Sequence, residues 1–260
     1  MFNPGSPYGG GGFGGGRGGF GRGAFGSRYQ YQTVPTGYAG VQSSGLISKV
    51  MGLLAFSFLF AFIGTIVGAY VFHIGSSLGT YWIVAIGGLV VLFILNFAIN
   101  VRGWNLFLLY LFTFLEGMAL SPIISAYLAA GQIYSNILGE AFLITAITSL
   151  ALAVYAWTTK RDFSRLGDYL FFGLILLLVV SLIGIFFNGF FNSGPLGLII
   201  SFFGIALFSG FVLYYVQRAR YLADTLPNAI GLTVSLFITV LNLFLFILRL
   251  LTILQGGNRR

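Results

Sequence analysis

The chain has 260 residues, of which 58% are hydrophobic and only 7% are charged, and its mean hydropathy is +0.96. A soluble domain carries about 25% charged residues, so this composition excludes a protein whose whole surface faces water. The formal net charge of +8 is better explained by loops that meet anionic lipid headgroups than by a nucleic-acid partner. The chain has no cysteine, which excludes disulfides and thiolate metal sites.

The first 44 residues form a separate compositional zone. The stretch 9–26 is mostly glycine, interrupted by phenylalanine and arginine. Such a segment cannot bury enough apolar area to offset its conformational entropy. We therefore predict a disordered cytoplasmic tail over residues 1–44 and one membrane domain over residues 45–260. Sequences rich in Gly, Arg and Phe also occur in RNA-binding tails, so the tail is the one exception to our expectation that no nucleic acid binds.

From Leu46 onward the chain is a series of apolar runs. Each run is continuous rather than alternating, which favours helices over the strands of a membrane barrel. Each is also close to the ~20 residues that a helix needs to cross a bilayer. The sequence therefore predicts an all-α integral membrane protein with seven transmembrane helices, at about 46–72, 80–99, 104–130, 137–157, 168–188, 194–215 and 229–254.

Positive charges are sorted among the predicted loops. Lys and Arg occur before the first span and in every second loop after it, whereas the loops around 74–79, 131–136 and 189–193 have none. Because positively charged loops stay in the cytoplasm, we predict a multi-pass protein of the plasma (inner) membrane with a cytoplasmic N-terminus. Seven crossings place Arg259 and Arg260 outside, against this rule, but the length of the last run favours a full crossing.

Glu116 is the clearest ionisable residue at membrane depth, since it lies in the middle of the third predicted helix. A carboxylate facing lipid is costly, so we expect it to face the bundle interior. Two interpretations stay open: a proton-sensitive or cation-coordinating group in an ion pathway, or a hydrogen-bonded glutamate that fixes helix packing. Hard cations prefer oxygen ligands, which makes Glu116 the candidate metal ligand.

A polar stripe runs along the last predicted helix. Ser235, Thr239, Asn242 and Arg249 are spaced so that they share one helical face, and we expect that face to point inward. The stripe either lines a pore or supplies polar contacts between helices, worth about 1 kcal/mol each. In the first helix, Gly64 and Gly68 form the Gly-x-x-x-Gly motif, which is typical of close helix packing.

Catalytic constellations are missing from the predicted spans. Intramembrane proteolysis needs a nucleophile with a base, or two facing carboxylates, and the only histidine is His73, in the first loop. We therefore expect no enzymatic activity and no cofactor.

Several motifs resemble those of the Bax inhibitor family. Residues 112–122 read FTFLEGMALSP and are similar to the family's third-helix signature, while 210–215, 233–249 and the loop 159–163 resemble its later helices and one of its loops. The resemblance covers about residues 46–254 and is to prokaryotic members. It implies six helices around a central seventh, a pH-sensitive calcium leak with Ca²⁺ as the transported ion, and roles in stress response or cell-death regulation. Bacterial members are also linked to modulation of a membrane protease.

One departure from the family concerns its pH sensor, which the resemblance implies is a pair of aspartates in the last two helices. The matching positions are Tyr215 and Thr239, and neither side chain offers a carboxylate that could share a proton. The arginine that would pair with the aspartates corresponds to Arg102. Glu116 is then the only deep carboxylate.

Two functions remain after these observations. The first is a channel-like cation leak whose pathway candidates share polar side chains at membrane depth. The second is a non-conducting scaffold or regulator of other membrane proteins or of a membrane protease, in contact with the lipid bilayer and those partners. A polar cavity that connects Glu116 with the cytoplasmic side favours conduction, whereas a purely apolar, closed core around Thr239 favours the scaffold. The candidate pathway residues are Glu116, Thr239, Asn242, Tyr215, Ser235 and Arg102.

Overall fold

The computed structural model describes residues 39–74, 78–163, 165–186 and 194–256, and over these ranges the chain forms seven α-helices and no strand. The predicted tail lies outside the described residues except for the start of the first helix. All seven helices are long and apolar enough to cross a membrane, which confirms the all-α membrane fold. The helices are α1 (Ala39–Tyr70), α2 (Leu78–Ala98), α3 (Trp104–Ala129), α4 (Gln132–Thr158), α5 (Leu166–Phe186), α6 (Gly194–Ala219) and α7 (Leu226–Gly256).

Three helices extend well beyond the predicted apolar runs. The helix α1 begins at Ala39 rather than near residue 46, so residues 39–44 are helical and the prediction of a disordered tail is wrong for them. In α4 and α6, polar residues continue the turns. The helix α4 begins at Gln132 rather than near residue 137, directly after Gly131, which adopts a φ of 101°. Within this added turn the Gln132 side-chain amide donates to Asn136 Oδ1 at 3.0 Å. The helix α6 continues past residue 215 to Ala219. Hydropathy alone makes both of these helices too short, because it does not count the polar residues that continue the helix at the ends of the spans.

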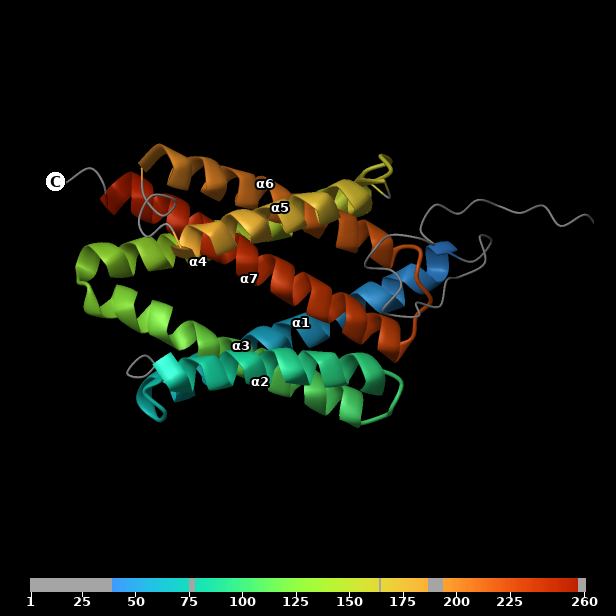
Figure 1. Cartoon of the computed structure of the whole chain (residues 1–260). Helices are drawn as coiled ribbons and strands as arrows, with labels where there is room; N and C mark the ends of the chain where they lie inside the picture. The colour runs from blue at the N-terminus through green and yellow to red at the C-terminus, as the bar shows by residue number, and fades with distance from the viewer. Residues whose placement is uncertain (1–38, 75–77, 164, 187–193, 257–260) are drawn as a thin grey trace, which may run out of the picture.

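The helix α7 is the central element of the bundle. It packs against α1, α3, α4 and α6 and crosses the middle of the view in Figure 1. Within the described parts of the chain, α2 packs against α3 alone and α5 against α6 alone. The central position of α7 is thus confirmed, with four helices packed directly against it and with α2 and α5 as outer walls, each attached to the bundle along one side.

The helices α1 and α3 approach each other most closely, at glycines. A Cβ atom added to Gly117 would lie 1.9 Å from the carbonyl oxygen of Ala61, and one added to Gly64 would lie 2.1 Å from that of Phe114. The Thr65 hydroxyl reaches across the same contact, 2.9 Å from the Gly117 carbonyl. The packing interpretation of the Gly-x-x-x-Gly motif is confirmed, since Gly64 and Gly68 lie against Phe114, Met118 and Ser121 of α3.

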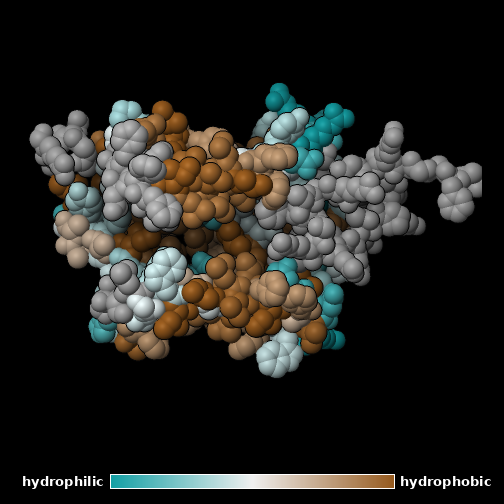
Figure 2. Space-filling view, viewed as in Figure 1, coloured by the Kyte–Doolittle hydropathy of each residue, from teal (hydrophilic) through white to brown (hydrophobic). Residues whose placement is uncertain are grey.

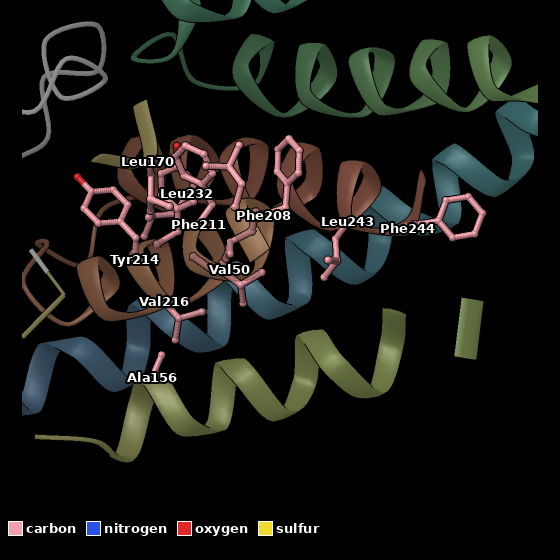
Figure 3. Packing of buried hydrophobic residues seen from close by; sticks show 14 of the residues in the cluster. Val50, Ala156, Leu170, Phe208, Phe211, Tyr214, Val216, Leu232, Leu243 and Phe244 are labelled. Atoms are coloured by element: carbon pink, nitrogen blue, oxygen red, sulfur yellow. The ribbon is translucent and has the colours of Figure 1, made fainter. Parts of the chain in front are cut away.

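The main hydrophobic core lies along α6 and α7. Figure 3 shows Phe208, Phe211 and Tyr214 of α6 beside Leu232 of α7, with Val50 of α1 on the same cluster. These side chains are all buried. The core therefore fixes α6 and α7 relative to one another and to α1.

The loop between α4 and α5 is held by one buried side chain of α6. Gln217, which is 2% exposed, accepts a hydrogen bond from the backbone N–H of Phe163 and donates one to the carbonyl oxygen of Arg161. Arg220 adds a hydrogen bond of 3.2 Å to the carbonyl of Thr159. A single glutamine thus satisfies two backbone groups of a basic loop.

Replacement of Gln217 by leucine should loosen this loop. The substitution leaves two loop backbone groups without their protein partner, which costs about 1–3 kcal/mol when the groups stay buried, so the loop should detach. We expect faster trypsin cleavage after Lys160, Arg161 or Arg165 in detergent, measured by intact mass. The control is Gln255→Leu, which removes the exposed Gln255–Glu140 contact at the far end of α4. Equal cleavage rates in the two variants would contradict this role for Gln217.

Candidate functional site

A groove of about 450 Å³ lies on one side of α7, between α2 and α5. Figure 2 shows the molecule hollowed across its middle, between the bodies formed around these two helices. The groove is lined by residues of four helices: Leu92, Asn96, Leu174, Leu177, Leu178, Ser181, Phe208, Phe211, Tyr215, Val234, Ser235, Ile238, Thr239, Asn242 and Phe246.

The groove opens sideways, toward the lipid. Its two walls do not pack against each other, since α2 is attached to α3 and α5 to α6 over the described residues. Ser181 and Leu178 on the α5 wall are exposed, and Asn96 on the α2 wall is half-buried. In a bilayer this opening faces the acyl chains, so the polar groups of the groove lie beside lipid.

The polar groups of the groove share one hydrogen-bonding pattern. Thr239 donates its hydroxyl to the carbonyl of Ser235 at 2.7 Å, and Ser235 donates to Gly231 at 3.0 Å. The amide nitrogens of Asn242 and Asn96 donate to the carbonyls four residues earlier, both at 2.8 Å. A side chain that donates to its own helix keeps its oxygen as an acceptor. The groove therefore presents a wall of neutral oxygen acceptors.

No lining residue of the groove is an Asp, Glu, Lys, Arg or His. Tyr215 and Thr239, the two positions that match the aspartates of the resembled family, both lie in the lining. Tyr215 is buried and stacks on Phe211, with ring centroids 5.7 Å apart. The groove lining at these two positions is thus neutral and partly aromatic.

The structure brings four of the six predicted pathway residues together and leaves two apart. Tyr215, Ser235, Thr239 and Asn242 share the groove. Glu116 instead faces α2, where its Oε1 lies 3.4 Å from the position of a Cβ on Gly88, and it is half-buried. Arg102 is exposed in the turn between α2 and α3. Neither Glu116 nor Arg102 lines the groove.

Asn96 and Ser181 belong to the groove but were not predicted from the sequence. Each is an isolated polar residue in the C-terminal half of an otherwise apolar helix, Asn96 in α2 and Ser181 in α5. Such residues seldom face lipid without a reason, so this was the signal that could have identified them. Their place on the two opposite walls was not recoverable from spacing along a single helix.

A second cavity, of about 330 Å³, lies between α3 and α7 near their C-terminal ends. Arg249 lines it with two hydroxyl groups, those of Tyr127 and Thr252, which are 2.6 Å apart. The remaining lining residues are apolar: Ile123, Leu245, Leu248 and Ile253. The predicted face of α7 that carries Arg249 therefore does point toward a cavity.

Within the described ranges, no three His, Cys, Asp or Glu residues lie close enough together to hold a metal ion. A cation in the groove would be held by hydroxyl and amide oxygens alone. Such oxygens are neutral, so they bind hard cations more weakly than carboxylates do.

Comparison with known proteins places the chain in a family. The family model described as inhibitor of apoptosis-promoting Bax1 matches residues 43–256. An uncharacterised protein of Campylobacter jejuni is 34% identical over 219 residues, which is 82% of this chain and 89% of that protein. The Golgi anti-apoptotic protein of vaccinia virus is 30% identical over 214 residues, covering 80% of this chain and 84% of that protein. Protein lifeguard 4 of Mus musculus is 30% identical over 167 residues, covering 64% and 66% of the two chains. The chain is a seven-helix membrane protein of the Bax inhibitor family.

Proposed function

We propose that this protein forms a passive leak for cations, with Ca²⁺ as the transported ion, in the plasma (inner) membrane and with its N-terminus in the cytoplasm. The supporting observation is the row of neutral oxygen acceptors at membrane depth, formed by Ser235, Thr239 and Asn242 in one groove. The groove lining also includes Tyr215 and Thr239, the two positions that match the aspartates of the family. We also propose that the protein is not an enzyme.

Neutral oxygen ligands favour the passage of a cation over its tight binding. A cation crossing a membrane needs oxygen ligands in place of its water, and conduction requires that it also leaves them easily. Hydroxyl and amide oxygens supply partial negative charge without the strong attraction of a carboxylate. The groove therefore favours a slow, ungated leak over a tight binding site.

Because no carboxylate lines the groove, we expect the rate of the leak to be independent of pH. A pair of aspartates responds to pH because the two groups share a proton, whereas Ser, Thr and Asn side chains do not titrate. This distinguishes the proposed leak from the pH-sensitive leak that the family resemblance implies. Glu116, at the contact of α2 and α3, is the remaining deep carboxylate whose contribution a substitution can test.

The test is Ca²⁺ flux into dye-loaded liposomes that carry the purified protein, at mildly acidic and at mildly alkaline pH. We expect flux above that of empty liposomes, at the same rate at both pH values, and an unchanged rate in Glu116→Gln. Flux that changes with pH and is lost in Glu116→Gln would place the pathway and its sensor at the α2–α3 contact instead. No flux from folded protein would overturn the leak.

A scaffold or regulator of other membrane proteins is the second candidate, and the outer walls of the bundle favour it. Only 11% of the most apolar window is buried in α2 and in α5, against 39% in α7. Two such helices offer apolar faces to a neighbouring membrane protein, including a membrane protease. A role in the stress response or in cell-death regulation is compatible with this candidate, as the name of the vaccinia virus relative suggests for that protein. If the folded protein shows no Ca²⁺ flux in liposomes, the scaffold or regulator is the function that this result supports.

A further inference from the structure

We propose that the groove and the Arg249 cavity form one track along which phospholipids with zwitterionic headgroups cross between the two leaflets. The headgroup would move along the polar face of α7 while the acyl chains stay in the surrounding lipid. This activity equilibrates the leaflets and needs no energy source and no covalent step. It uses the same groove as the cation leak but does not depend on cation passage.

The two cavities follow one another along α7, the groove bounded by α2, α5 and α6 and the Arg249 cavity bounded by α3. On this helix the groove is lined by residues 235, 239, 242 and 246, and the Arg249 cavity by residues 249 and 253. Successive members of this row are three or four residues apart, the spacing that keeps side chains on one helical face. The described lining runs from Val234 to Ile253, which is about 28 Å of helix at 1.5 Å per residue.

This length matches what a headgroup has to cross, because the hydrocarbon core of a bilayer is about 30 Å thick. The groove part of the track is also accessible from the side. The walls α2 and α5 do not pack together in the described ranges, and Leu178 on the rim is 56% exposed. A closed pore could pass an ion but could not pass a headgroup whose acyl chains remain outside.

The chemistry of the track suits a headgroup that carries both charges. The ammonium group of phosphatidylcholine or phosphatidylethanolamine is attracted by the side-chain oxygens of Thr239 and Asn242, which each donate one hydrogen bond to their own helix. The phosphate is attracted by the guanidinium of Arg249, which offers paired donors to phosphate oxygens. The two hydroxyls of Tyr127 and Thr252 keep the same cavity polar.

A polar track lowers the main barrier to lipid crossing, which is the removal of the headgroup from water. Without it, the phosphate and ammonium pass through hydrocarbon with no polar partner. Along α7, the polar residues 235, 239 and 242 follow one another at about one helical turn, and Arg249 follows about two turns further on. The row 235, 239, 242 and 249 thus divides one large barrier into several smaller ones.

The test uses liposomes of phosphatidylcholine with a trace of headgroup-labelled fluorescent phosphatidylethanolamine, together with a reductant that cannot cross the membrane. In empty liposomes the reductant bleaches only the outer-leaflet label. With the protein present we expect bleaching to proceed to nearly all the label. A plateau at the level of empty liposomes, from protein shown to be folded and inserted, would overturn the proposal.

Variants connect the activity with the track. The bleaching of inner-leaflet label that has crossed the membrane forms a second, slower phase. We expect Asn242→Leu to slow this phase about tenfold, the factor that corresponds to about 1.4 kcal/mol. We expect Ser181→Trp, which adds bulk at the exposed rim without removing a buried contact, to slow it as well. The control is Thr145→Val on α4, which lines a different, apolar cavity and should leave the rate unchanged. Equal rates in all four proteins would place lipid crossing elsewhere and overturn the track.

Two measurements on the same liposomes separate this activity from others. A water-soluble form of the fluorescent label trapped inside should stay unbleached, because bleaching of the trapped label would show entry of the reductant and overturn the proposal. Calcium flux is recorded in parallel. Flux without lipid crossing refutes this inference and leaves the leak, whereas lipid crossing without flux supports this inference and refutes the leak.

Discussion

Replacement of Gly117 by alanine should prevent stable packing of α1 on α3. The added methyl carbon would lie 1.9 Å from the carbonyl oxygen of Ala61 and 2.7 Å from its Cα. These are backbone atoms, so the clash cannot be relieved by a side-chain rotation and the two helices must separate. Overpacking of a well-packed core costs about 1–3 kcal/mol and occasionally more. We expect the upper end of this range or a protein that does not fold, measured as thermal unfolding of purified protein in detergent.

The matched control for this prediction is Gly52→Ala. Gly52 lies in the same helix α1, but an added Cβ would have no atom within 4 Å. Alanine removes the conformational freedom of glycine without creating a contact, so the unfolding temperature should stay the same or rise slightly. Equal unfolding temperatures for Gly117→Ala and Gly52→Ala would show that α1 and α3 are not held at the distance described.

The double variant Thr239→Val, Asn242→Leu should lose most of its Ca²⁺ flux while remaining folded. Each substitution keeps the approximate shape of the side chain and removes an oxygen from the groove. The loss of one polar partner for a desolvated ion costs about 1–3 kcal/mol, so two together predict a decrease of about thirtyfold or more, at a factor of ten per 1.4 kcal/mol. The measurement is the initial rate of dye response in liposomes.

Thr145→Val is the appropriate control because the two threonines match closely. Thr145 is 4% exposed and donates to the carbonyl of Ala141 at 2.7 Å, while Thr239 is 3% exposed and donates to that of Ser235 at 2.7 Å. They differ in the cavity that they face, since Thr145 lines a mostly apolar cavity formed by α1, α3, α4 and the opposite side of α7. An equal loss of flux in both variants would mean that the hydroxyl of Thr239 acts through stability, and the groove would not be the pathway.

The seven helices could be predicted because each is a long apolar run, and hydropathy depends on residues that are adjacent in sequence. The polar face of α7 could also be predicted, since side chains three or four positions apart share a face. The same rule identified Ser235, Thr239 and Asn242 before any tertiary contact was described. Tyr215 was identified only through resemblance to a family, because a tyrosine in an apolar helix has no signal of its own.

The walls of the site could not be predicted, because they depend on which helices do not touch. Nothing in the sequences of α2 and α5 shows that each packs along one side only, and this separation is what brings Asn96 and Ser181 to the groove. The position of Glu116 shows a related difficulty. Its depth in the bilayer followed from its place in the sequence, but the helix it faces depends on the rotation of α3 against Gly88 of α2.

The attachment of α2 and α5 along one side each has a mechanical consequence. The distance between these helices is not fixed by a direct contact in the described parts of the chain, so the lateral pressure of the acyl chains on their outer faces contributes to it. Thickness and tension of the bilayer act on both helices, because each spans the hydrocarbon layer. The width of the opening is therefore a joint property of the protein and of the membrane around it.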